Sequence, residues 1–123
     1  MRVLVADEDE MMLEFISDIL HSEDHHVSTA NGYEEAIDLV DKEDFDMIIT
    51  DILIPDDQGS DFIQYIQTKD LKTRILAVTG GVENAKQDYL NYVDMFCDQS
   101  LAKPFGKRDL LDAIHEVMAQ KKD

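Results

Sequence analysis

Short apolar stretches rich in β-branched residues recur along the chain. They cover residues 3–6, 26–30, 47–50, 75–79 and, with a weaker pattern, 95–101. Stretches of this length and composition are typical of buried strands rather than of helices. The pattern therefore predicts five strands.

Between these stretches, apolar residues recur with the three- to four-residue spacing of helices. This spacing is clearest in residues 12–20, 36–40 and 62–66, and 110–118 shows it after the last predicted strand. Alternating helices and nearly all-apolar strands indicate a parallel sheet covered on both faces. The sequence thus predicts one doubly wound α/β domain with a five-stranded parallel sheet, filling residues 1–123.

The composition narrows the choice of partners. Acidic residues number 28 against 11 basic ones, which gives a formal net charge of -17. Such a charge repels nucleic acid and anionic membranes, so we expect proteins or cations as partners instead. The single cysteine, Cys97, cannot form an internal disulfide, and the sequence shows no signal peptide or membrane span. We therefore expect a cytoplasmic protein.

Polar side chains gather where the predicted strands end. Asp7 and Glu8 follow the first strand, Asp51 follows the third, Thr79 ends the fourth, and Lys103 follows the fifth. Each has an ordinary explanation, since Asp often caps helices and Thr often occupies turns. Ligands of open parallel sheets bind outside the carboxyl ends of the strands, however, and all these residues are predicted to share that edge.

These residue types suit one kind of chemistry. Carboxylates packed together raise one another's pKa unless a cation lies among them, and a site with few oxygen ligands suits Mg²⁺. An Asp carboxylate can act as the nucleophile that forms an aspartyl phosphate, while a metal and a lysine neutralise the phosphoryl oxygens. The residue types at this edge therefore match what phosphoryl transfer to an Asp carboxylate needs.

Four segments also carry a family resemblance. They are VLVADED at 3–9, IITDILIP at 48–55 together with Gly59, AVTG at 77–80, and AKPF at 102–105. In this order and spacing they resemble the response-regulator receiver domains of two-component signalling, over essentially the whole chain. The resemblance implies a flavodoxin-like sheet with strand order 2-1-3-4-5.

The resemblance also implies roles for single residues. Asp51 would be the phosphoacceptor, and Asp7 and Glu8 would be the acidic pair that holds Mg²⁺. Asp51 itself and the main-chain carbonyl of Leu53 would complete the protein ligands of the metal.

On the other side of the expected site, the resemblance implies that Thr79 contacts the phosphoryl group and shifts when the group arrives. Lys103 would pair with the phosphoryl oxygens, and its bond to Pro104 would be cis. One departure from the family concerns Ser100, which stands where an aromatic residue usually changes rotamer together with the threonine. We therefore expect a reduced or rerouted switch.

The expected partners are a histidine kinase or a histidine phosphotransfer protein, with the chain itself a monomer or weak dimer. A diffusible regulator, a phosphorelay intermediate and a fragment of a longer protein all remain open. A small phosphatase with an Asp nucleophile is the rival, but Leu53 supplies no general acid two positions after Asp51. A receiver-like fold that no longer takes phosphate is disfavoured by the complete set of site residues.

The histidines and the methionine pair near the first helix are interpreted as structural or surface residues rather than as metal ligands or phosphorelay histidines. His21 and His115 are predicted to lie on helix surfaces, and residues 25–26 lead into the second strand. Met11 and Met12 open the first helix beside the acidic edge, where soft side chains suit a docking surface. Core packing is expected for at least one of the two methionines.

Overall fold

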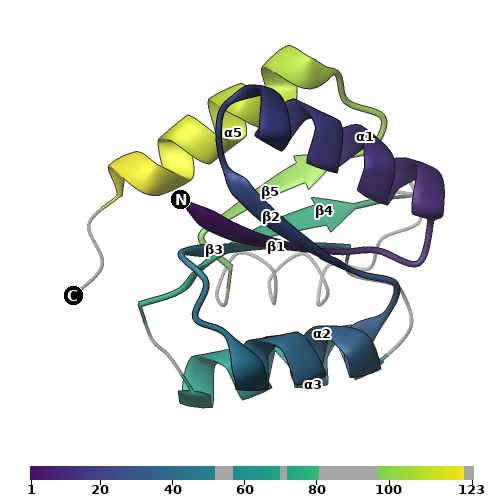
Figure 1. Cartoon of the computed structure of the whole chain (residues 1–123), viewed down its shortest axis with the longest axis vertical. Helices are drawn as coiled ribbons and strands as arrows, with labels where there is room; N and C mark the ends of the chain where they lie inside the picture. Colours follow the sequence, from purple (N-terminus) through teal and green to yellow (C-terminus); the bar gives the residue numbers. More distant parts are fainter. Residues whose placement is uncertain (52–56, 70–71, 81–96, 121–123) are drawn as a thin grey trace.

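The computed structural model describes residues 1–51, 57–69, 72–80 and 97–120. Strands and helices alternate through most of this part of the chain (Figure 1). In chain order the elements are β1 (Arg2–Ala6), α1 (Glu10–Ser22), β2 (His26–Ala30), α2 (Tyr33–Lys42), β3 (Met47–Asp51), α3 (Asp57–Lys69), β4 (Arg74–Thr79), β5 (Gln99–Ala102) and α5 (Lys107–Ala119).

The sheet is parallel throughout, and its five strands lie in the order β2-β1-β3-β4-β5. Helices α1 and α5 cover one face, and α2 and α3 cover the other (Figure 1). The predicted doubly wound sheet and its strand order 2-1-3-4-5 are confirmed. The carboxyl ends of all five strands consequently meet at one edge.

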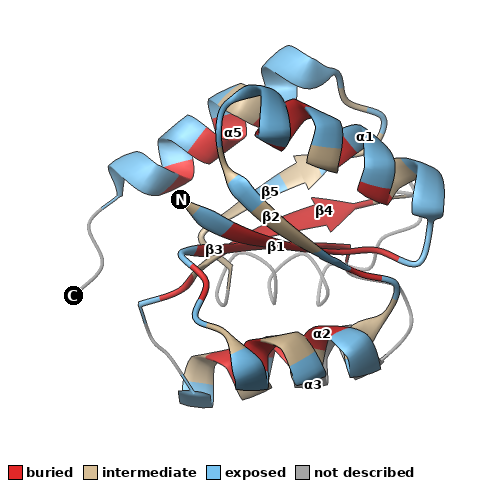
Figure 2. Cartoon of the chain, in the orientation of Figure 1, coloured by how far each residue is buried: buried red, intermediate tan, exposed pale blue. Residues whose placement is uncertain are grey.

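The central strands contribute to two separate cores, because successive side chains of a strand point to opposite faces. Val5 and Ile49 pack with α1 and α5, whereas Leu4 and Ile48 pack with α2 and α3. Figure 2 shows the largely buried central strands β1, β3 and β4 between the exposed outer faces of the helices. This burial on both faces explains why β1 and β3 are nearly all apolar in sequence.

The start of the fifth strand differs from the prediction of 95–101. Strand β5 begins at Gln99, and neither Cys97 nor Asp98 belongs to it. The Asp98 carboxylate accepts a hydrogen bond of 2.7 Å from the main-chain N–H of Ile75. If the strand continued backward from Gln99, a main-chain carbonyl would accept this hydrogen bond instead. Residues 95 and 96 of the predicted strand lie outside the described residues.

Two further expectations concern single features. The peptide bond between Lys103 and Pro104 is cis, as the family resemblance implies. Among the described helices, none combines the length and the apolar character needed to cross a bilayer.

Candidate functional site

Residues from separate strands converge at the carboxyl edge of the sheet. Asp7 directly follows β1, Asp51 ends β3, and Thr79 ends β4. These three polar side chains are buried, with exposed fractions of 5%, 8% and 6%. Adjacent strands end at nearly the same level of the sheet. The last register pairs are Ala6 with Thr50, Asp51 with Val78, and Thr79 with Ala102.

The ammonium group of Lys103 lies between two of the carboxylates. Its Nζ is 3.2 Å from Oδ2 of Asp7 and 3.6 Å from Oδ1 of Asp51. The main-chain N–H of Lys103 donates to the carbonyl of Thr79 at 2.7 Å, so the lysine is anchored to the end of β4. The predicted meeting of these residues at one edge is therefore seen in the structure.

Burial controls the ionisation of Asp51. Burial is the largest cause and the negative charge of Asp7 the second, and the net result is a pKa raised from the ordinary 3.8 to about 6. Lys103 opposes both effects, and Glu8 makes a smaller contribution in the raising direction. Asp51 is therefore an anion at neutral pH, but one that is held in an unfavourable environment.

Asp7 is fixed by the start of α1. Its Oδ1 accepts a hydrogen bond of 2.8 Å from the main-chain N–H of Asp9, which leaves Oδ2 toward Lys103. Asp9 is the N-cap of α1, and its side chain accepts from the N–H of Met11 at 3.0 Å. An Asp at this position satisfies one of the unpaired donors of the helix end, which explains the local sequence.

A small hollow of about 10 Å³ opens beside the two buried carboxylates. Its lining consists of Ala6, Asp7, Glu8, Gly32, Tyr33 and Asp51. Glu8 is exposed, and within residues 1–51, 57–69, 72–80 and 97–120 no three His, Cys, Asp or Glu side chains are placed to hold a metal. Leu53, the further predicted ligand, lies outside the described residues. Two carboxylates nevertheless match the small number of protein ligands that Mg²⁺ commonly takes.

Tyr33 is a site residue that the sequence interpretation missed. Its hydroxyl donates a hydrogen bond of 2.7 Å to the main-chain carbonyl of Asp51, and its ring lies 5.4 Å from that of Phe62. The hydroxyl of Thr50 donates to the same carbonyl at 3.2 Å. The one available signal was an aromatic residue directly after Gly32, a few positions before the helical spacing of residues 36–40.

The plainer interpretations of the histidines are confirmed. His21 and His115 are exposed on α1 and α5, and His26 begins β2. Nδ1 of His25 lies 3.2 Å from the amino group of Met1.

The methionine pair at the start of α1 divides as expected. Met12 packs against the core on the α1 side, whereas Met11 is 80% exposed. Phe15, one turn later, is also exposed, and its ring lies 6.1 Å from that of Phe105. Met11 and Phe15 thus form an exposed apolar strip on α1, next to the partly buried Phe105.

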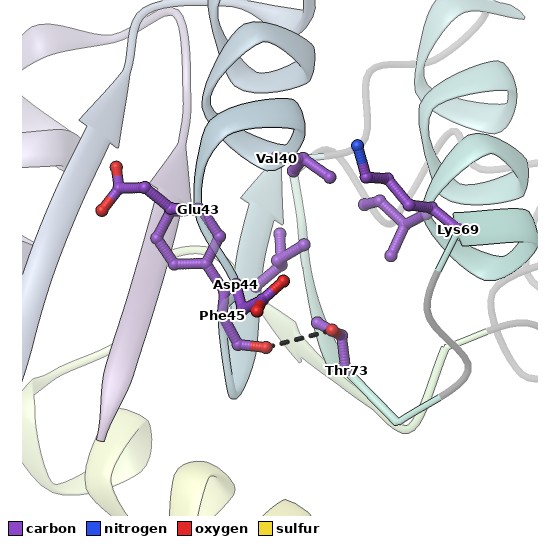
Figure 3. Close-up of a pocket in the computed structure, with 8 residues that line it drawn as sticks. Val40, Glu43, Asp44, Phe45, Lys69 and Thr73 are labelled. Atoms are coloured by element: carbon purple, nitrogen blue, oxygen red, sulfur yellow. Dashed lines mark hydrogen bonds between the residues drawn. The ribbon is translucent and has the colours of Figure 1, made fainter.

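A second hollow, of about 120 Å³, lies near the amino ends of β3 and β4 (Figure 3). It is lined by Val40, Glu43, Asp44, Phe45, Ile48, Ile66, Lys69 and Thr73. Across it, the Thr73 hydroxyl donates to the carbonyl of Phe45 at 3.0 Å. None of the predicted site residues that the structure describes lines this hollow, which lies at the opposite edge of the sheet from them.

Comparison with known proteins places the chain in a family. The family model described as the response regulator receiver domain matches residues 3–115. The chain belongs to this family. The receiver is 32% identical to the cell cycle response regulator CtrA of Brucella ovis and to that of Brucella abortus, over 99% of its own length. It covers 52% of those regulators, so the chain spans about half the length of the curated relatives it matches.

Solved structures show the same architecture. A CheY-like receiver domain protein from Methanospirillum hungatei superimposes with a TM-score of 0.85 at 26% identity, covering 96% of this receiver and 93% of that chain. The response regulator TrrA from Thermotoga maritima, solved in complex with Mg(2+)-BeF, gives 0.78 at 24% identity, with 94% and 97% covered. The receiver is thus a signalling domain of two-component systems.

Proposed function

We propose that Asp51 of this receiver accepts a phosphoryl group, in a Mg²⁺-dependent reaction, from a histidine kinase or a histidine phosphotransfer protein. The observation that carries the proposal is the Lys103 ammonium placed between the buried carboxylates of Asp7 and Asp51. A partly buried cation between two buried anions at the carboxyl edge of a parallel sheet matches the needs of phosphoryl transfer.

The two carboxylates also fit a magnesium ion. Asp7 and Asp51 would hold it, with the predicted ligands Glu8 and the Leu53 carbonyl completing the protein side. The raised pKa of Asp51 supports this fit, because the repulsion from Asp7 that contributes to it is what a cation relieves. When bound, Mg²⁺ would supply positive charge that neutralises phosphoryl oxygens during transfer.

In the proposed reaction, a carboxylate oxygen of Asp51 attacks the phosphorus of a phosphohistidine. The new O–P bond forms as the N–P bond breaks, and the electron pair of that bond returns to the histidine nitrogen. Lys103 would pair with a phosphoryl oxygen, and the buried Thr79 would contact another. Without a bound metal the pKa of Asp51 is raised to about 6, so the carboxylate is already ionised at neutral pH and can act as the nucleophile.

The exposed apolar strip on α1 suits the docking of the phosphoryl donor. Met11 and Phe15 expose apolar surface, and Phe105 connects the strip to the segment carrying Lys103. Exposed apolar patches beside a site mark interaction surfaces.

We propose that residues 1–123 form one cytoplasmic receiver that acts as a monomer or weak dimer, and its output depends on protein partners.

The test is phosphorylation by an acyl-phosphate donor with Mg²⁺, followed by intact mass. Wild-type protein should gain one phosphoryl group that hydroxylamine removes, and Asp51→Asn should gain none. Asp41→Asn is the matched control, because Asp41 also pairs with a lysine but lies on exposed surface. Undiminished labelling of Asp51→Asn would overturn the assignment, and steady turnover of phosphoesters would favour the phosphatase alternative.

A further inference from the structure

The side chain of Tyr33 connects the first residue of α2 to the last residue of β3. Gly32 precedes it with a φ of 152°, a value that favours glycine, and its carbonyl accepts from the N–H of Ala36 at 3.1 Å. The chain therefore turns sharply before α2 begins. This turn places Tyr33 beside the small hollow that Asp7 and Asp51 also line.

We propose that Tyr33 is a positioning residue for the phosphoacceptor, an inference that rests on the proposed function of Asp51. Its hydroxyl donates to the main-chain carbonyl of Asp51 at 2.7 Å, a distance typical of a well-formed O–H···O bond. Asp51 is the residue whose side chain must face Lys103. Holding its peptide group therefore also fixes the direction in which its carboxylate leaves the strand.

The surrounding strands explain why this carbonyl needs an external donor. The register between β1 and β3 ends at the pair of Ala6 and Thr50, one residue before Asp51. Beyond that pair, the chain after β1 turns away to start α1. The Thr50 hydroxyl reaches the carbonyl only at 3.2 Å, so Tyr33 supplies the shorter of the two hydroxyl contacts.

Packing holds the phenol in place. The Tyr33 ring lies 5.4 Å from the ring of Phe62, at an angle of 33°, and Phe62 is 1% exposed in the core under α2 and α3. The Tyr33 hydroxyl carries no charge, so removing it changes no charge near Asp51. A change in reactivity on losing the hydroxyl would therefore report on geometry.

Tyr33→Phe is the deciding variant, since it removes the hydroxyl and keeps the ring on Phe62. Tyr65→Phe is the matched control, because the Tyr65 hydroxyl donates to the carboxylate of Asp41, at the other edge of the sheet. Labelling rates would be measured with an acyl-phosphate donor at saturating Mg²⁺, alongside the melting temperature of each variant. We expect Tyr33→Phe to slow labelling by roughly three- to tenfold, the range that one hydrogen bond accounts for.

A spectroscopic signature separates positioning from a general loss of stability. The carbonyl ¹³C resonance of Asp51 should shift in Tyr33→Phe and stay in place in Tyr65→Phe, because only the first loses a donor to that carbonyl. Slower labelling together with this shift would support the proposal. Wild-type labelling rates in Tyr33→Phe, equal slowing in both variants, or an unmoved resonance would overturn it.

The proposed function fails in a different way. If wild-type protein takes no label, Asp51 is not the acceptor and Tyr33 has no acceptor to position. If the wild type takes one label and Tyr33→Phe takes it equally fast, the acceptor assignment stands and only the role of Tyr33 is overturned.

Discussion

Two pairs of Asp and Lys lie at opposite edges of the same sheet, and the pKa values of their two Asp carboxyls are shifted in opposite directions. Asp41 and Lys69 approach to 2.6 Å with side chains 43% and 37% exposed, beside the second hollow. Asp51 and Lys103 are 3.6 Å apart, with side chains 10% and 23% exposed. The pKa of Asp41 lies below its usual value because Lys69 and then Tyr65 donate hydrogen bonds to it. The pKa of Asp51 is raised to about 6, chiefly by burial.

The difference shows that a neighbouring lysine does not decide the state of a carboxylate by itself. At the exposed edge, water solvates Asp41 and the ion pair adds little. At the buried edge, the loss of water around Asp51 outweighs the attraction of Lys103 and leaves the anion destabilised. An unfavourable anion that is nevertheless retained in the structure is typical of a functional site.

The largest expected effect comes from removing the lysine of the buried pair, with the lysine of the exposed pair as its control. Lys103→Met should slow labelling of Asp51 by roughly 100-fold, because one fixed positive group at transferring oxygens is worth that much. Lys69→Met should label at the wild-type rate, since Lys69 lies at the other edge. Intact mass against time measures both. Equal labelling rates in the two variants would contradict a special role of Lys103 in phosphoryl transfer to Asp51.

Removing the carboxylate of the buried pair should stabilise the protein at neutral pH. In Mg²⁺-free buffer at pH 7.5, Asp51→Asn should raise the free energy of unfolding by up to about 3 kcal/mol, from the rise of the pKa from 3.8 to about 6. The folded state holds this proton more tightly than the unfolded state. Wild-type stability attributable to Asp51 is therefore complete below pH 3.8 and is lost as the pH rises through 6.

Urea denaturation of both proteins at a series of pH values measures this difference. The gain from Asp51→Asn should vanish below about pH 4. Asp41→Asn should behave in the opposite sense, because the lowered pKa of Asp41 means that its contribution is present at neutral pH and is lost on acidification. A loss of stability in Asp51→Asn at pH 7.5 would contradict the raised pKa.

A smaller effect is expected from the neighbouring acids. Asp7→Asn should lower the pKa of Asp51, but not to 3.8, because burial is the larger cause of its shift. Glu8→Gln should lower it less, since Glu8 is exposed and makes the smallest contribution. Carboxyl ¹³C titrations of the three proteins measure the order. Both variants should also bind Mg²⁺ more weakly and label more slowly.

The smallest effect is expected at the switch position. Ser100 is exposed on β5, and it presents no ring that could change exposure when Thr79 moves. With a beryllofluoride mimic at Asp51, amide exchange should therefore change most around Asp51 and Thr79 and least on β5 and α5. Dominant changes across β5 and α5 would show that the switch has not been rerouted.

Part of the site could be predicted because topology alone assembles it. Once the strands were recognised as parallel, the residues after them had to share an edge, and Asp7, Asp51 and Lys103 do. The roles of these residues stay predictions for the labelling experiments. Tyr33 could not be found this way, because its contact depends on how far a side chain from one helix reaches toward a particular carbonyl.

The fifth strand illustrates a second limit. Residues 95–97 are apolar and suggest that the strand continues back to 95, but hydropathy cannot show which group pairs with the neighbouring strand. Asp98 uses its carboxylate to accept from Ile75, and its own N–H donates to the carbonyl of Ile75 at 2.9 Å. The regular ladder therefore begins only at Gln99.

The two oxygens of Asp7 serve different neighbours, and this division has a thermodynamic consequence. Oδ2 faces Lys103, while Oδ1 holds the N–H of Asp9, whose own carboxylate holds the N–H of Met11. A cation drawn to Asp7 and a protein bound over Met11 would thus act on one short hydrogen-bonded segment. If binding of the partner protein raises the affinity of the receiver for the cation by some factor, thermodynamic reciprocity requires the cation to raise the affinity for the partner by the same factor.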